Sequence, residues 1–291
     1  KLLANILTTF LVLFYLRKII TFRVDKVIVK KCLKFSLPLI PFFFVFWIGR
    51  YADRYILERH ISLADIAIFG LLMTFTGLIS MASEALANSI QPYLFEAYNK
   101  IKENINRINQ LFIFYSLGLI VFCSFLISIV SNIHIIKPNE KYLEIIPYFY
   151  LAIVPTLLNG IQYLLFNIFT YSKKSKRLAL ISFVTVSTQL IVLFILVQNH
   201  KIYGAILASF IGNIVSLIWY VIESKSYLNI TYKWKLILPP PILFFSFLAV
   251  SIYMGENNIF NYRQIGLFFP IPILLFLGLI YKRYISRIIF K

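Results

Sequence analysis

Long apolar runs separated by short polar segments are the main pattern along this chain of 291 residues. A helix needs about 20 mostly apolar residues to cross a lipid bilayer. On that criterion the pattern predicts about nine membrane-spanning helices, at residues 2–16, 35–57, 64–92, 110–131, 145–171, 178–198, 203–222, 237–254 and 264–281. We therefore expect an all-α fold, a polytopic transmembrane helix bundle.

The composition also indicates that lipid surrounds much of the chain. The chain is 60% hydrophobic and only 14% charged, which is more apolar surface than one water-soluble core can bury. A formal charge of +18 would suggest nucleic acid as a partner of a soluble domain, but here the basic residues lie in the gaps between apolar runs. We expect membrane lipids as partners and no nucleic acid.

The distribution of lysine and arginine predicts which side each loop lies on, because these residues accumulate in cytoplasmic loops. One set of alternate segments holds Arg17, Lys18, Arg23, Lys26, Lys30, Lys31, Lys34, Lys100, Lys102, Arg107, Lys173, Lys174, Lys176, Arg177, Lys225, Lys233, Lys235, Lys282, Arg283, Arg287 and Lys291. The other set holds only Arg59, Lys137, Lys141, Lys201 and Arg263. This alternation predicts a cytoplasmic C-terminus. Residues 17–34 have the basic amphipathic pattern of a helix on the cytoplasmic face.

Sequence motifs for catalysis are not found. Nothing resembles a phosphate-binding P-loop, a dinucleotide-binding glycine turn, a zinc-protease histidine pair or a nucleophile elbow. Cys32 and Cys123 lie at different depths of the predicted topology, so a disulfide between them is not expected. The three histidines, His60, His134 and His200, fall in separate external loops and are predicted to be interfacial. We expect no enzymatic activity, no cofactor and no metal site.

Charged residues at bilayer depth are candidates for function because they are costly to bury. Arg50, Asp53 and Arg54 have the spacing that stacks three side chains on one helix face, with the carboxylate between two guanidinium groups. Arginine is well suited to bind phosphate oxygens. Two interpretations stay open: the three residues line a cavity, or they reach an outer interface and pair with each other.

Glu84 is a further charged residue, in the cytoplasmic half of its predicted helix. Its depth differs from that of Arg54 by roughly 20 Å, so the two cannot meet directly. Glu84 either titrates or binds a coupling cation, or it is a protonated, hydrogen-bonded core residue.

Uncharged polar residues in the predicted spans give weaker signals. They either line a water-filled path or bond to a neighbouring helix. The candidates are Asn159 and Gln162, together with Asn88, Gln91, Thr185, Thr188 and Gln189. A second pattern of small residues at every fourth position, Gly204, Ala208, Gly212 and Ser216, predicts close helix packing.

Several short segments resemble one known family in their order and spacing. They are LKFSLPLIP at 33–41, ADRYIL at 52–57, IAIFG at 66–70, SIQPY at 89–93 and YGA at 203–205. Together they resemble the polysaccharide biosynthesis proteins of the O-antigen flippase (Wzx-type) family, within the multidrug/oligosaccharidyl-lipid/polysaccharide exporter superfamily.

The resemblance implies a fold of two six-helix bundles around a central cavity. On that basis residues 1–34 are the end of a first-bundle helix and a basic cytoplasmic linker. Residues 35–222 are the second bundle, and residues 223–291 are two additional C-terminal helices. The chain then lacks most of the first bundle.

The resemblance also implies a function, namely translocation of an undecaprenyl-pyrophosphate-linked oligosaccharide across the bacterial inner membrane by alternating access. The process serves O-antigen or capsular polysaccharide synthesis. The implied partners are this lipid-linked oligosaccharide and the polymerase and chain-length regulator of the same pathway. Arg50 and Arg54 would bind its anionic groups, with Asp53 holding them in place. Asn159 and Gln162 would contact the substrate, and Glu84 would couple transport to an ion.

Two rival functions stay open. A multidrug antiporter of the same superfamily prefers acidic side chains in its cavity, which the arginine pair disfavours. A membrane enzyme, such as a polymerase or an acyltransferase of polysaccharide assembly, has a similar composition. A polymerase usually carries a sizeable external loop, and the longest one here is the short segment around His134.

Overall fold

The computed structural model describes residues 2–17, 25–37, 39–132, 144–228, 232–256, 264 and 278. Every regular element within these ranges is an α-helix. The helices are α1 (Leu2–Leu16), α2 (Lys26–Ser36), α3 (Leu39–Leu57), α4 (Leu63–Asn99), α5 (Ile101–Ser131), α7 (Ile145–Tyr171), α8 (Ser175–Leu228), α9 (Trp234–Ile237) and α10 (Pro239–Glu256).

Four of these helices, α4, α5, α7 and α8, are long and apolar enough to cross a membrane. Helices α1 and α10 are apolar but shorter, and α3 carries three charged residues near its end. The predicted all-helical, membrane-type fold is confirmed at this level. Eight of the predicted spans fall on described helices, while residues 264–281 lie almost entirely outside the described part of the chain. Nine crossings and a two-bundle architecture stay predictions.

Helix α4 begins where two reciprocal hydrogen bonds cap it. The backbone N–H of Asp65 donates to Ser62 Oγ at 3.2 Å, and the backbone N–H of Ser62 faces Asp65 Oδ2 at 3.4 Å. This capping box satisfies amide groups that have no partner in the first helical turn.

The connection between α4 and α5 is shorter than the apolar pattern predicts. Helix α4 continues through Pro92 to Asn99, and α5 begins at Ile101. An ion pair of 3.2 Å between Arg107 and Glu96 joins the polar ends of the two helices. The predicted boundaries at 92 and 110 are wrong because apolarity marks only the part of a helix that lipid would surround, whereas the helix itself extends further.

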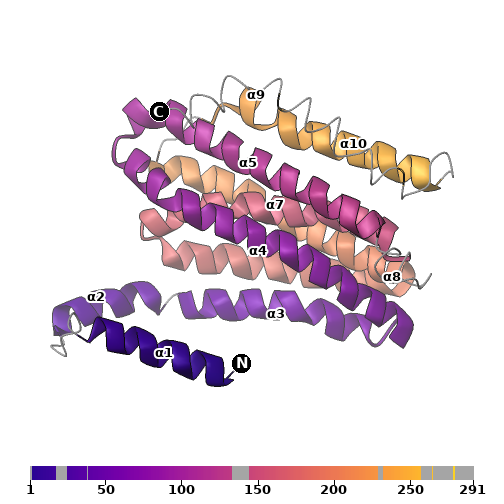
Figure 1. Ribbon diagram of the computed structural model, residues 1–291, viewed down its shortest axis with the longest axis horizontal. Helices are drawn as coiled ribbons and strands as arrows, with labels where there is room; N and C mark the ends of the chain where they lie inside the picture. The colour runs from indigo at the N-terminus through magenta and orange to yellow at the C-terminus, as the bar shows by residue number, and fades with distance from the viewer. Residues whose placement is uncertain are drawn as a thin grey trace.

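Helix α7 lies at the centre of the bundle and packs against α4 and α8, while α5 packs on α4 and α3 packs on α8 (Figure 1). Tyr115 of α5 is fully buried, and its hydroxyl lies 2.6 Å from the Gly160 carbonyl of α7 and 3.1 Å from the Ser83 carbonyl of α4. A Cβ at Gly160 would lie 2.8 Å from Ser83 Oγ. Glycine therefore permits the close approach of α4 and α7.

Helix α8 is a hairpin of two antiparallel arms, residues 175–200 and 202–228. Lys201 has φ 46° and ψ −122°, which reverses the chain. A Cβ at Gly204 would lie 2.9 Å from the carbonyl oxygen of Leu196, and Arg177 pairs with Glu223 at 3.8 Å, so the arms lie side by side along their length. Each arm is about 39 Å long, enough to cross a bilayer. The two arms correspond to the predicted spans 178–198 and 203–222.

The small-residue pattern lies between these arms. Gly204, Ala208, Gly212 and Ser216 are all buried, and a Cβ at Gly212 would lie 3.1 Å from Gln189 Cβ of the facing arm. The prediction that these residues allow close helix packing is confirmed.

Basic residues gather at one end of the bundle, at the left in Figure 1. This end contains α2, the end of α4, the start of α5, the end of α7 and both termini of α8. Among its described basic residues are Arg17, Lys26, Lys30, Lys31, Lys34, Lys100, Lys102, Arg107, Lys173, Lys174, Lys176, Arg177, Lys225, Lys233 and Lys235. The opposite end has Glu58, Asp65 and Glu144 beside Arg59 and Lys201. The folded chain thus keeps the charge asymmetry of its loops, and we call the basic side the basic end.

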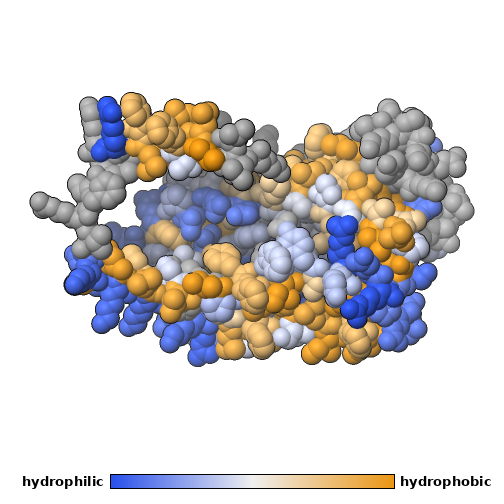
Figure 2. Space-filling model, turned by 90° about the horizontal axis from the view of Figure 1, so that it is seen from below, coloured by the Kyte–Doolittle hydropathy of each residue, from blue (hydrophilic) through white to orange (hydrophobic). Residues whose placement is uncertain are grey.

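Large apolar side chains are exposed over much of the surface, among them Phe44 and Trp47 of α3, Phe125 of α5 and Phe194 of α8. Figure 2 shows hydrophobic residues over wide areas, with hydrophilic residues at both ends of this face and inside a hollow at its left. Apolar exposure on this scale suits lipid rather than water.

Candidate functional site

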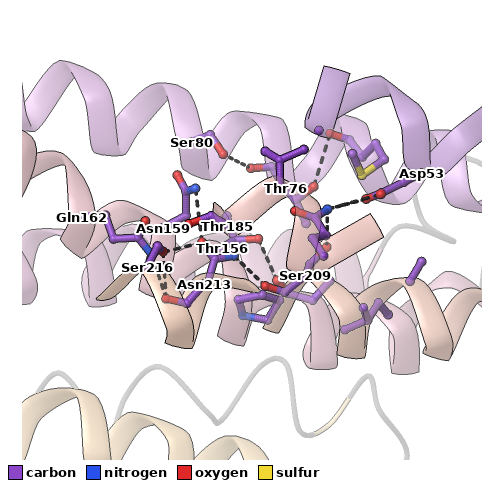
Figure 3. Close-up of a pocket in the computed structure, with 18 of the residues that line it drawn as sticks. Asp53, Thr76, Ser80, Thr156, Asn159, Gln162, Thr185, Ser209, Asn213 and Ser216 are labelled. Carbon is purple, nitrogen blue, oxygen red and sulfur yellow. Dashed lines mark hydrogen bonds between the residues drawn. The ribbon is translucent and has the colours of Figure 1, made fainter. Parts of the chain in front are cut away.

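A polar cavity of about 250 Å³ lies inside the bundle, between α3, α4, α7 and α8 (Figure 3). Its walls mix apolar side chains such as Phe69, Leu72 and Phe166 with many hydroxyl and amide groups. The polar residues that line it are Asp53, Thr76, Ser80, Thr156, Asn159, Gln162, Tyr163, Ser182, Thr185, Gln189, Ser209, Asn213, Ser216 and Tyr220. Such a concentration of polar groups between membrane-length helices marks this cavity as the candidate site.

Asp53 occupies one end of the cavity and is only 4% exposed. The Nε2 amide of Gln189, on the first arm of α8, lies 3.2 Å from Asp53 Oδ1 and 3.0 Å from Oδ2. The same Nε2 atom lies 3.3 Å from Ser209 Oγ, on the second arm. One glutamine amide therefore connects the carboxylate of α3 to both arms of α8.

A close approach of α3 to α8 brings these groups together. Gly49 lies one helical turn before Asp53 on the same face of α3. A Cβ at Gly49 would lie 2.8 Å from a methyl carbon of Val186. A side chain at position 49 would force Val186 or α3 to shift, and a shift of α3 would lengthen the contact between Asp53 and Gln189.

Asn213 organises the other end of the cavity. Its Oδ1 atom accepts from Gln162 Nε2 at 3.1 Å, and the more distant Asn159 Nδ2 lies at 3.4 Å. Its own Nδ2 donates to the Ser209 carbonyl at 2.9 Å, and its backbone carbonyl accepts from Ser216 Oγ at 3.0 Å. The bonds from Gln162 and Asn159 join α7 to the second arm of α8, and the other two lie within that arm.

A polar stripe on α4 extends from the cavity towards the basic end. Gly77 and Ser80 line the cavity, and Glu84, Asn88 and Gln91 continue on the same helix face at spacings of three and four residues. Glu84 and Asn88 are exposed. Glu84 lies about 18 Å along the helix from Glu96, the next acidic residue of α4, within the long apolar part of that helix.

Gln91 ends this stripe with an interhelical contact. Its Nε2 atom donates to Oδ1 of Asn167 on α7 at 3.0 Å, and the buried Nδ2 of Asn167 has no hydrogen-bond partner among the described residues. The polar face of α4 is thus continuous with polar groups of α7.

The predicted residues are distributed between the cavity and its surroundings. Asp53, Asn159 and Gln162 line the cavity, as do the weaker candidates Thr185 and Gln189. Glu84 does not line the cavity and is exposed one helical turn beyond Ser80, and both of its interpretations stay predictions.

The arginines lie elsewhere. Arg54 is exposed and is not among the residues that line the cavity. The backbone of Arg50 is part of α3, but its side chain lies outside the described part of the structure. The expected arrangement, a carboxylate held between two guanidinium groups, is not found among the described side chains, where Gln189 rather than Arg54 contacts Asp53.

Some cavity residues were not predicted. Ser209 and Asn213 each follow a member of the small-residue pattern by one position, and Thr76 and Ser80 follow each other by one helical turn on α4. A helical-wheel projection groups Ser209 with Asn213, which is the one signal that could have indicated them.

The chemistry of the cavity suits neutral hydroxyl-bearing groups and hard cations. Asparagine and glutamine amides offer both donors and acceptors, and hydroxyl groups can do either. A single carboxylate with hydroxyl oxygens nearby is a donor set for a hard cation or a proton. In the described residues, no group of three or more histidine, cysteine, aspartate or glutamate side chains could hold a metal ion.

Comparison of the chain with protein-family models, with curated proteins and with solved structures found no match.

Proposed function

We propose that this chain takes part in moving a lipid-linked oligosaccharide across the bacterial inner membrane, with its C-terminus in the cytoplasm. The observation that carries the proposal is the cavity rich in amides and hydroxyls inside a bundle of apolar, membrane-length helices. Sugar hydroxyls need many neutral donors and acceptors, which the side chains of Asn159, Gln162 and Asn213 supply.

The lipid part and the sugar part of such a substrate need different surroundings. The exposed apolar faces of the helices suit a polyprenyl tail in the hydrocarbon region, while the cavity and the polar stripe of α4 suit the headgroup. A charged residue such as Glu84 is costly next to lipid, so we infer that its face of α4 borders water or the headgroup.

The size of the cavity limits what it can hold. Its volume of about 250 Å³ is below the 300–1,000 Å³ usual for pockets that enclose a drug-sized ligand. We propose that it holds a single sugar ring of the headgroup. The pyrophosphate and the other sugars need space outside it, where Arg50 and Arg54 are the proposed anion-binding residues.

Transport in this proposal follows alternating access and involves no chemical step on the substrate. Glu84 keeps its proposed role in ion coupling. Asp53 is a second candidate for that role because it is the carboxylate that lines the cavity.

Complementation tests the proposal. The gene is expressed in a bacterium whose O-antigen flippase has been deleted, and surface lipopolysaccharide is stained. Restored surface polymer that is lost in Asn213→Leu but kept in Thr188→Val supports the proposal, because Thr188 lies on α8 but not in the cavity wall. If no surface polymer is restored, the gene is deleted in its native host. Absence of accumulated undecaprenyl-linked oligosaccharide there would contradict the proposal.

A multidrug antiporter is the second candidate, and one observation favours it. The cavity is lined by a carboxylate, Asp53, and by the aromatic residues Phe69 and Tyr220, and groups of both kinds can bind an organic cation. Efflux of a cationic dye that is abolished by Asp53→Asn, together with unchanged lipid-linked oligosaccharide, would favour this function over the first.

A further inference from the structure

Helix α2 has two faces of opposite character. Lys26, Lys30 and Lys34 recur every fourth residue and share one face with Lys31, and the opposite face carries Ile28, Val29, Cys32 and Leu33. The side chain of Asp25 accepts a hydrogen bond of 2.8 Å from the backbone N–H of Val27 and caps the helix. The pattern is therefore presented on a formed helix with a defined start.

Neither face of α2 is covered by the rest of the described chain. All four lysines are exposed, and the exposed fractions of Ile28 and Leu33 are 59% and 55%. Figure 1 shows that α2 extends past the bundle at its basic end, on the continuation of α3. Its apolar face is thus unpartnered at the level where the membrane-length helices end.

Two simple placements of α2 are unfavourable. Inside the hydrocarbon region the four lysines would be too costly, and in bulk water the row of aliphatic side chains would stay exposed. The interface between headgroups and acyl chains satisfies both faces, because lysine side chains can reach the headgroups while the aliphatic side chains enter the acyl boundary.

The chain between α2 and α3 permits this placement. Helix α2 ends at Ser36, and the next residues are Leu37 and Pro38. Helix α3 begins at Leu39, and because proline has no amide hydrogen, position 38 cannot donate a helical hydrogen bond between the two helices.

We infer that α2 docks on the membrane surface at the basic end of the bundle and binds anionic lipid headgroups through Lys26, Lys30, Lys31 and Lys34. Charge complementarity selects the lipid class, since each lysine near an anionic surface contributes to binding and zwitterionic headgroups do not provide this attraction. The docking of α2 is independent of which molecule the bundle transports.

Cys32 is a probe for this docking because it lies on the apolar face of α2 and is exposed, whereas Cys123 is fully buried. The full chain is reconstituted in nanodiscs of phosphatidylcholine alone or mixed with phosphatidylglycerol. The rate of labelling by a membrane-impermeant maleimide is then measured. We expect labelling of Cys32 to be slower by about ten-fold or more with the anionic lipid, since several lysines act together.

Two variants serve as controls for the face and for the charge. A Cys32→Ser/Val27→Cys variant moves the thiol to the lysine face, and its labelling should depend little on the lipid. The Lys26→Gln/Lys30→Gln/Lys34→Gln variant should lose the protection of Cys32. The matched Lys173→Gln/Lys176→Gln/Lys225→Gln variant, which removes as many exposed lysines from the same end, should keep it.

Two results would overturn the inference. Equal, fast labelling of Cys32 in both lipid mixtures would show that α2 stays in water. Equal, slow labelling in both mixtures, unaffected by the lysine substitutions in α2, would show that protein rather than anionic lipid covers the apolar face.

Discussion

The contact between Asp53 and Gln189 leads to a prediction about stability. The carboxylate is only 4% exposed, and the Gln189 amide lies within hydrogen-bond distance of both its oxygens, at 3.2 and 3.0 Å. Gln189→Leu keeps an apolar stem of similar length but removes that donor. A buried hydrogen bond contributes about 0.5–1.5 kcal/mol, and leaving the buried carboxyl group without its donor costs about 1–3 kcal/mol more. We expect the free energy of unfolding to fall by about 3 kcal/mol.

A double-mutant cycle separates this contact from general disruption of the cavity. Asp53→Leu alone leaves the Gln189 amide without its main acceptor, whereas Asp53→Leu/Gln189→Leu removes both partners. Two apolar side chains leave no buried atom without a hydrogen-bond partner. The loss of free energy of unfolding in the double variant should therefore be about 2 kcal/mol smaller than the sum of the losses in the single variants. Unfolding is measured in mixed micelles with rising sodium dodecyl sulfate, followed by tryptophan fluorescence.

Thr188→Val is the matched control on the same arm of α8. Among the described residues, the Thr188 hydroxyl bonds only the Val184 carbonyl of its own helix, at 2.8 Å. Its removal should therefore change the free energy of unfolding by about 0.5 kcal/mol or less. Strictly additive losses in the cycle, or a Gln189→Leu variant as stable as this control, would refute the idea that Gln189 holds the carboxylate.

Three further predictions concern packing and the polar stripe. Gly204→Ala should lower the free energy of unfolding by about 1–3 kcal/mol, because its Cβ would lie 2.9 Å from a backbone oxygen of the facing arm. Gly70→Ala, with no neighbour within 4 Å of its Cβ, should be neutral or slightly stabilising, and denaturant titration of both variants compares them. Tyr115→Phe should cost about 1 kcal/mol in the same titration, through the lost hydrogen bond to α7, and an unchanged midpoint would contradict the 2.6 Å contact. In a Cys32→Ser background, Glu84→Cys should react with an impermeant maleimide faster than Ala85→Cys, which is exposed on the apolar flank about 100° round the helix. The reverse order would mean that lipid covers the stripe.

The cavity and α2 represent two different uses of polar residues in an apolar chain. In the cavity, the side chains of Gln189 and Asn213 bond polar groups of other helices or of the facing arm, and so link α3, α7 and both arms of α8. On α2, lysines are concentrated on one face and have no such partners in the described helices. The first arrangement is suited to a solute inside the bundle, and the second to a charged surface outside it.

The sequence alone determined the helices and their approximate positions. Length and apolarity are local properties, and a long apolar segment has no other way to satisfy its backbone groups in lipid. The basic residues of alternate loops likewise meet at one end once the helices are antiparallel, so the loop pattern already predicted the charge asymmetry. The ends of α4 and α5 were missed because polar residues continue a helix as well as apolar ones do.

Only the tertiary structure determines which groups each polar side chain contacts. Gln189 and Asp53 are 136 positions apart, and they contact each other because Gly49 lets α3 approach α8. Helical spacing correctly grouped Asn159 with Gln162, but it could not show that both reach Asn213 on another helix. Spacing within one helix shows which residues share a face. Whether that face meets lipid, water or a neighbouring helix depends on how the helices pack, and packing is determined by contacts between distant parts of the chain.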